Sequence, residues 1–211
     1  MSLKPLLLRT FAVASLAAGL AFAPASQAQV NETYVTIEPA QPSDTADKIE
    51  VLEFFAYTCP HCYTMEPMTA KWAQTLPQNV AFKRVPVAFN ASMADLQKFY
   101  YSLEALDRLD LHAKFFHALH RERKRIYDFK AMSKWVEEQG VAPADFEAAF
   151  TSFGINNKVA RANELAKNYN IEGTPSLAIG GRYVTSPSMT GTYENAIVEA
   201  QKRLDAVLAA Q

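Results

Sequence analysis

The sequence predicts an α/β protein in which a central mixed sheet is flanked by helices and interrupted by an inserted all-helical subdomain. Residues 49–57 are apolar and aromatic with little alternation, a pattern typical of a central strand that is covered on both faces. Pro60 follows closely and suits the first turn of a helix, because a proline has no N–H to lose there. From Ser92 to about residue 165, apolar residues recur at helical spacing, and strand patterns return only afterwards.

The first 28 residues are typical of a secretory signal peptide. Lys4 and Arg9 precede an apolar stretch at residues 11–23, and small residues follow up to Ala28. The apolar stretch is shorter than the ~20 residues that a membrane-spanning helix needs. We therefore expect cleavage after Ala28. Removing these two basic residues from the 21 in the chain leaves fewer basic than the 22 acidic residues, so the charge gives no indication of nucleic-acid binding.

The N-terminal half is expected to contain two further strands around the helix that Pro60 opens. Residues 34–37 predict a short strand in an otherwise polar arm, and the helix continues to Trp72. Residues 80–87 predict a strand that runs parallel to the central one, connected across the helix. Pro86 indicates that this strand ends there or lies near an edge of the sheet.

The middle of the chain is expected to be helical. Apolar residues follow helical spacing over residues 96–106 and again over residues 115–119. Asp128 is a candidate N-cap of a further helix, Gly140 is its expected end, and Pro143 is expected to open the next one. We expect the many aromatic residues of these helices to form a core.

The C-terminal part is expected to return to the sheet. A helix starting at residue 156 or 157 is followed by residues 176–184, which predict a β-hairpin with Gly180-Gly181 as its turn. Residues 193–208 predict the last helix, because their apolar positions share one face.

The two cysteines of the chain, Cys59 and Cys62, carry the candidate chemistry. Cys59 lies at the N-terminus of the helix that Pro60 opens, where unpaired N–H groups and the positive end of the helix dipole favour a thiolate. We expect its pKa to fall below the ~8.5 of a free cysteine, so Cys59 is the candidate nucleophile. Cys62, one turn further in, is the candidate resolving thiol. His61 lies between them and can donate a hydrogen bond or a positive charge to the Cys59 thiolate.

Other interpretations of the Cys-x-x-Cys spacing stay open, namely two unrelated core cysteines or half of a zinc site. A structural zinc normally takes four ligands, and the remaining candidates are the four histidines of the chain: His61, His112, His117 and His120. A structural disulfide is a poor explanation, because a bridge that closes so short a loop constrains little of the unfolded chain. A redox-active Cys59–Cys62 disulfide explains the spacing better, and we expect no metal.

The motif around the cysteines resembles one known family. Residues 51–62 spell VLEFFAYTCPHC, and Gly173-Thr174-Pro175 follows later in the chain. Together they resemble the DsbA family of periplasmic thiol-disulfide oxidoreductases, and the Cys-Pro-His-Cys core is specific within thioredoxin-like proteins. The similarity spans residues 49–209, although most of the middle matches in pattern rather than in motif.

The resemblance implies a thioredoxin fold interrupted by helices. We expect the thioredoxin-like domain to consist of residues 29–89 and 166–211. The helical insertion is expected to span residues 90–165, and residues 1–28 are the predicted signal peptide.

The resemblance also implies roles for residues beyond the cysteines. Thioredoxin-like folds place a cis-proline loop against the two cysteines, so we expect a cis bond before Pro175. The Thr174 backbone is then free to pair with an extended substrate, as in strand addition. Glu53 is a carboxylate in an apolar strand, and a buried charge is costly unless it is paired or protonated. The family indicates that Glu53, with Lys83, handles the proton or tunes the field beneath Cys62. An exposed strand end and a purely structural pair with Lys83 are the alternatives.

The expected function is that of a soluble periplasmic dithiol oxidase, in a Gram-negative bacterium, that introduces disulfides into newly exported unfolded proteins. The resemblance implies a DsbB-like quinone-linked membrane protein as the reoxidising partner, and we expect a monomer without an organic cofactor. A disulfide isomerase or reductase and a non-enzymatic zinc or chaperone module are the alternatives. Residues 120–125, HRERKR, are a charge run that we interpret as a solvated helix end or, alternatively, a docking patch.

Overall fold

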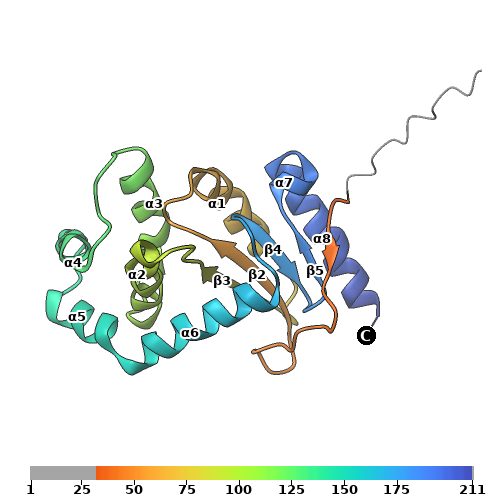
Figure 1. The fold of residues 1–211 in the computed structure, drawn as a ribbon, viewed down its shortest axis with the longest axis horizontal. Helices are drawn as coiled ribbons and strands as arrows, with labels where there is room; N and C mark the ends of the chain where they lie inside the picture. Colours follow the sequence, from red (N-terminus) through yellow and green to blue (C-terminus); the bar gives the residue numbers. More distant parts are fainter. Residues whose placement is uncertain (1–31, 211) are drawn as a thin grey trace, which may run out of the picture. The chain divides into compact units, whose positions relative to one another are not determined.

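A five-stranded mixed sheet with helices on both faces forms the centre of the computed structural model, which describes residues 32–210 (Figure 1). The strand order is β1-β5-β4-β2-β3. The central strand β2 pairs in parallel with β3 and antiparallel with β4, which confirms the predicted mixed sheet. The strands are β1 (Val35–Thr36), β2 (Ile49–Phe55), β3 (Val80–Pro86), β4 (Ser176–Ile179) and β5 (Tyr183–Thr185).

Helices account for most of the remaining described residues. They are α1 (Pro60–Ala73), α2 (Ala94–Ala105), α3 (His112–His120), α4 (Phe129–Glu138), α5 (Pro143–Thr151), α6 (Phe153–Asn168), α7 (Pro187–Thr190) and α8 (Tyr193–Ala209). Two short 3₁₀ helices precede α2 and α3, at Ala91–Met93 and Leu109–Leu111. Within residues 32–210, none of these helices has the length and apolar character that crossing a membrane requires.

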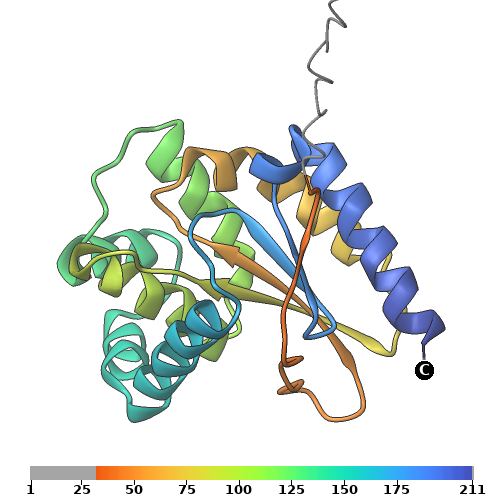
Figure 2. The ribbon, with the colours of Figure 1, turned by 45° about the vertical axis from the view of Figure 1, so that its right-hand side comes forward.

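Side chains on the two faces of the sheet belong to two separate hydrophobic clusters. Ile49 and Val51 of β2 pack with side chains of α1 and α8, whereas Leu52 and Phe54 of the same strand belong to the larger cluster that α2 to α6 complete. Figures 1 and 2 accordingly show α8 and α6 on opposite faces of the sheet. Because both faces of β2 are covered, the strand carries a nearly continuous apolar run, as predicted.

The hairpin between β4 and β5 fixes the N-terminal arm. Gly180 and Gly181 form its turn with φ angles of 57° and 74°, a conformation that favours glycine. A Cβ atom on Gly181 would lie 2.1 Å from the carbonyl oxygen of Gln41, so no larger residue fits. The short strand expected within residues 34–37 forms at Val35–Thr36 and pairs with β5.

Several helix ends follow local capping rules. Asp128 caps α4 by accepting a hydrogen bond from the N–H of Ala131 at 2.9 Å, as predicted. The next helix but one, α6, starts at Phe153 and not at residue 156 or 157, because Ser152 accepts from the N–H of Ile155 and caps it. Helix α7 was not predicted from the sequence.

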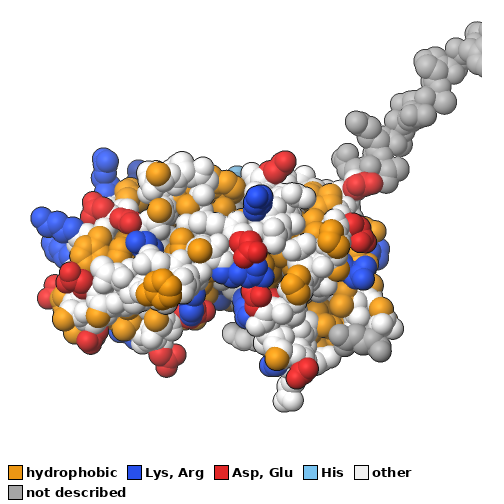
Figure 3. Space-filling model, turned by 60° about the horizontal axis from the view of Figure 1, so that its bottom comes forward, with side chains coloured by type: hydrophobic (Ala, Val, Ile, Leu, Met, Phe, Trp, Pro, Cys, Tyr) orange, Lys and Arg blue, Asp and Glu red, His pale blue; other side chains and the backbone are white. Residues whose placement is uncertain are grey.

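The predicted domain limits stay a prediction. All regular elements between Ala91 and Asn168 are helices, but α6 continues across the expected boundary at residues 165 and 166. The predicted signal peptide lies outside the described residues. On the face shown in Figure 3, basic and acidic side chains lie interspersed, and ion pairs such as that between Arg161 and Asp44 join helix α6 to the N-terminal arm.

Candidate active site

The turn between β2 and α1 places Cys59 at the N-terminus of the helix. The N–H of Cys59 donates to the carbonyl of Ala56 at 3.0 Å, which closes the turn after the strand. Cys59 then caps α1, because its Sγ accepts a hydrogen bond from the N–H of Cys62 at 3.4 Å, and Pro60 occupies the first helical position. Both cysteines are free thiols in this structure.

The two thiols have opposite electrostatic environments. A hydrogen bond from the Cys62 thiol, the backbone N–H groups of Cys62 and His61, and the Thr174 side chain together lower the pKa of Cys59 to about 5, against the effect of its partial burial. Cys62 is 1% exposed, and burial followed by its contact with Cys59 raises its pKa far above that of a free thiol. Near neutral pH, Cys59 is therefore a thiolate and Cys62 keeps its proton.

The loop before β4 lies against Cys59. Ser176 of β4 pairs with Phe54 of β2, and this register brings the preceding residues beside the end of β2. The bond between Thr174 and Pro175 is cis, as the family resemblance implies. The Cys59 thiol donates to the Thr174 carbonyl at 3.2 Å. This contact needs the proton and so opposes ionisation, but the donors to Cys59 outweigh it.

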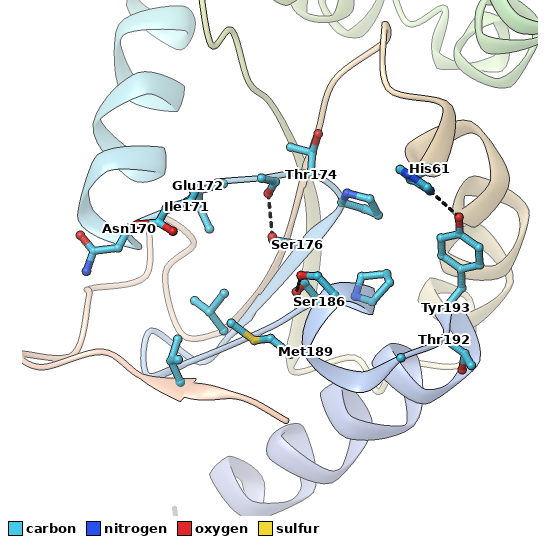
Figure 4. A pocket seen from close by; sticks show the side chains of 17 residues that line it. His61, Asn170, Ile171, Glu172, Thr174, Ser176, Ser186, Met189, Thr192 and Tyr193 are labelled. Atoms are coloured by element: carbon cyan, nitrogen blue, oxygen red, sulfur yellow. Dashed lines mark hydrogen bonds between the residues drawn. The ribbon is translucent and has the colours of Figure 1, made fainter. Parts of the chain in front are cut away.

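A cavity of about 520 Å³ opens beside this loop (Figure 4). Its lining includes Thr174, Pro175, Met189 and Tyr193, and Figure 4 shows His61 beside Tyr193. The lining area is mostly apolar, with a few polar groups, which is the usual character of a site that binds an organic or peptide ligand. Met189 and Tyr193 could not be assigned to the site from the sequence, since only the tertiary fold brings α7 and α8 to it.

The side chain of His61 differs from the expectation. Its Nδ1 lies 2.7 Å from the Tyr193 hydroxyl, in the direction of the cavity (Figure 4). The backbone N–H of His61, and not its ring, is the group that lowers the pKa of Cys59. The position after Pro60 therefore acts on the thiolate through the main chain.

The expected pairing of Glu53 with Lys83 is wrong. Glu53 faces Arg84, with Oε2 and Nε 3.1 Å apart, while Lys83 donates to Glu50 at 2.6 Å. The register explains this, because Glu53 is opposite Arg84 across the parallel pair, and Lys83 projects to the other face of the sheet. The alternative of an exposed strand end also fails, since Glu53 is 1% exposed.

The surroundings of Glu53 raise the pKa of its carboxyl group. Burial raises its pKa to about 7, and the positive charge of Arg84 limits the rise. The negative charge of Glu66 raises it further, and Thr69 donates a hydrogen bond to Glu53 Oε1 at 3.0 Å. Such a carboxyl group can gain or lose a proton near neutral pH.

A buried polar chain continues from Arg84, and the sequence did not predict it. Arg84 also donates to Glu66 Oε1 at 2.9 Å, and Glu66 Oε2 lies 3.3 Å from His112 Nε2. His112 Nδ1 lies 2.8 Å from the hydroxyl of Tyr57, the residue two positions before Cys59. Burial lowers the pKa of His112, which favours its neutral form.

The other histidines considered as zinc ligands have different partners. His117 faces Glu122 at 3.1 Å on the surface, and His120 lies 2.8 Å from the Tyr57 carbonyl. Over residues 32–210, no group of three or more His, Cys, Asp or Glu side chains is arranged to hold a metal ion.

Comparison with known proteins identifies one family of relatives. The family model of the DSBA-like thioredoxin domain matches residues 50–198. The thiol:disulfide interchange protein DsbA of Bordetella parapertussis is 56% identical over 183 residues, which are 87% of this chain and 88% of the relative. The protein of the same name from Burkholderia cepacia is 35% identical over 192 residues, covering 90% and 91%.

A solved structure agrees with these matches. The crystal structure of Pseudomonas aeruginosa DsbA superimposes with a TM-score of 0.81 at 30% identity, covering 84% of this chain and 93% of that one. Within this chain, the Cys-Pro-His-Cys motif lies at the N-terminus of α1 with the cis-proline loop against it. The chain belongs to the DsbA family of thiol:disulfide interchange proteins.

Proposed function

We propose that this chain is a protein dithiol oxidase that introduces disulfide bonds into newly exported, unfolded proteins through Cys59 and Cys62. The observation that carries the proposal is the asymmetry of the two thiols. Cys59 is half-buried, and its pKa is lowered to about 5, while Cys62 is buried, with a raised pKa. The low pKa stabilises the Cys59 thiolate and with it the reduced protein. The Cys59–Cys62 disulfide is therefore a strong oxidant, because stabilising the reduced form favours electron uptake.

The asymmetry assigns a role to each sulfur in the exchange. A substrate thiolate attacks Cys59 Sγ, the Cys59–Cys62 bond breaks, and Cys62 leaves and takes up a proton. A second substrate thiolate then attacks the substrate sulfur of the mixed disulfide, and Cys59 leaves as a thiolate. The substrate gains one disulfide, and two electrons remain on the Cys59–Cys62 pair.

Glu53 supports the proton step. Its carboxyl group, with a pKa of about 7, can release the proton that Cys62 requires and recover it later. In this proposal Arg84 takes the place that the sequence had assigned to Lys83, because Arg84 is the cation in contact with Glu53.

The substrate is expected to dock beside Thr174. The Thr174 carbonyl accepts a hydrogen bond from Cys59 only while that thiol carries its proton, which the thiolate, disulfide and mixed-disulfide forms of Cys59 all lack. The carbonyl can then accept an N–H of an extended substrate, as in strand addition. The apolar cavity lined by Pro175 and Met189 would receive a neighbouring side chain of the substrate.

The two electrons must leave the protein before the next cycle. We propose a DsbB-like quinone-linked membrane oxidase as the acceptor, the periplasm as the compartment, and a monomer as the working unit, because the family resemblance implies all three. Cys62 and Cys59 exchange electrons without an organic cofactor in this scheme.

Trapping variants test the assignment of the two sulfurs. Replacing Cys62 by Ser removes the resolving thiol, so Cys59 should accumulate in mixed disulfides that are visible on non-reducing gels of periplasmic extracts. Cys59→Ser is the matched control and should give none. Trapping through Cys62 in the Cys59→Ser variant would overturn the proposal. So would failure of the oxidised wild-type protein to restore activity to reduced, unfolded ribonuclease.

A further inference from the structure

The residues at both ends of helix α3 form hydrogen bonds with the same residue, Tyr57. The first residue of the helix, His112, lies 2.8 Å from the Tyr57 hydroxyl, and the last, His120, lies 2.8 Å from the Tyr57 carbonyl. A carbonyl can only accept, so Nε2 of His120 must carry the proton. His112 faces the Glu66 carboxylate through its own Nε2, so its Nδ1 accepts the proton of the Tyr57 hydroxyl.

Tyr57 is the residue through which β2 leads into the active-site turn. Its ring is 1% exposed and packs edge-on against Phe55 and Phe115, with centroids 5.2 and 4.8 Å away. Its carbonyl lies inside the turn that the hydrogen bond from Cys59 N–H to the Ala56 carbonyl closes. Holding this carbonyl therefore fixes the peptide plane between Tyr57 and Thr58, the second plane before Cys59.

His120 contacts the motif on its other side as well. Its ring stacks on Tyr63, the residue after Cys62, with centroids 5.1 Å apart and planes 10° apart. The stack limits the ring to one plane, and in that plane Nε2 meets the Tyr57 carbonyl. The charge run at residues 120–125 therefore begins with a partly buried side chain, whereas residues 121–125 are exposed.

We propose that His120 is a positioning residue of the active site, which holds the Tyr57 carbonyl so that the turn aims Cys59 Sγ at the N–H groups of His61 and Cys62. This inference rests on the proposed role of Cys59. It predicts that His120 acts on Cys59 by holding the turn in position and not by its charge, because the hydrogen bond to the Tyr57 carbonyl needs only a neutral N–H group. The alternatives are that His120 merely packs on Tyr63, or that it acts as a positive charge.

Three variants separate these roles. His120→Phe keeps an aromatic ring for the stack on Tyr63 but removes the donor, and His120→Gln restores a neutral donor. His117→Phe is the matched control, because His117 lies on the same helix, is exposed, and its ring hydrogen-bonds only Glu122 among the described residues. The readouts are the Cys59 pKa from ultraviolet thiolate absorbance and the equilibrium constant with glutathione.

We expect His120→Phe to raise the Cys59 pKa by about one unit, a tenfold change in ionisation. The equilibrium constant at neutral pH should shift about tenfold toward a weaker oxidant, because the reduced form loses the same stabilisation. His120→Gln should return both quantities to near wild type, and His117→Phe should change neither.

Wild-type values in His120→Phe would overturn the inference and leave the proposed function standing. Failure of His120→Gln to restore them would show that a neutral donor at this position is not sufficient, and would overturn it too. If His120→Phe does not fold, His120→Asn serves instead, because its shorter side chain does not bring the donor to the carbonyl. An ordinary Cys59 pKa in the wild type would instead refute the proposed function itself.

Discussion

Reduction of the Cys59–Cys62 pair should stabilise the fold in a pH-dependent way, which is the reverse of a structural disulfide. The Cys59 thiol has a pKa of about 5 in the folded protein, against 9.0 for an unperturbed thiol. Because the folded pKa is the lower one, this stabilisation is fully present above the unfolded pKa and is lost as pH falls through the folded pKa. The window for the effect is therefore about pH 5 to 9.

The magnitude follows from the two pKa values. A pH of 7 lies two units above the pKa of the folded thiol. At 1.36 kcal/mol per unit, ionisation of Cys59 then stabilises the reduced fold by about 2.7 kcal/mol. Cys59 is only half-buried, so screening by water reduces the effect, and we expect about 1–2.5 kcal/mol. The raised pKa of Cys62 acts in the opposite sense, but only above the unfolded thiol pKa, so it does not contribute at pH 7.

Denaturant melts of the reduced and the oxidised protein from pH 5 to 8 measure this directly. The oxidised form has no thiol to titrate and serves as the control. The difference in unfolding free energy, reduced minus oxidised, should rise with pH at up to about 1.4 kcal/mol per unit. The reduced form should be the more stable one near neutral pH. A difference that stays flat with pH, or an oxidised form that is more stable at pH 7, would refute the reasoning.

Three further predictions concern the residues around the cysteines. His61→Pro should raise the Cys59 pKa, because it removes the backbone N–H that stabilises the thiolate. His61→Ala keeps that N–H and should raise the Cys59 pKa less. Equal shifts of the two variants in thiolate titrations would contradict this prediction. Thr174→Val should also raise the Cys59 pKa, by up to about one unit, because the Thr174 side chain lowers it; an unchanged glutathione equilibrium would count against this. Arg84→Met should destabilise the fold by about 3–5 kcal/mol in denaturant melts, because it leaves buried carboxylates unpaired. Lys83→Met should cost less, since Glu50 keeps the Thr45 hydroxyl and the Asp44 N–H as donors, and the reverse order would show that Lys83 is the important cation.

The parts of the molecule that depend on local chemistry could be predicted from the sequence. Pro60 at the start of α1, Asp128 as a cap and the glycine turn of the hairpin each need only their neighbours in the chain. The position of Cys59 at a helix N-terminus followed from the same rule. Its lowered pKa could therefore be expected before any tertiary contact was known.

The parts of the molecule that depend on strand register and tertiary contact could not be predicted from the sequence. Lys83 and Arg84 are adjacent, and a slip of one residue moves a strand side chain to the other face, so the sequence could not decide which of them meets Glu53. His112 and His120 are far from Cys59 in the chain, and no spacing indicates that both would reach Tyr57. The sequence suggested the Cys59 thiolate as the partner of the His61 ring, and only the position of α8 brings Tyr193 to it instead.

The groups that act on Cys59 come from two distant parts of the chain, and this has a consequence for the folding protein. The N–H groups of α1 are local, but Thr174 follows more than a hundred residues later, beyond all the helices of the middle region. Until β4 has paired with β2, that contribution is missing, and Cys62 is not yet buried. The pKa of Cys59 therefore reaches its lowest value only after β4 has paired with β2, and the full reactivity of the protein toward other thiols comes last, with completion of its tertiary structure.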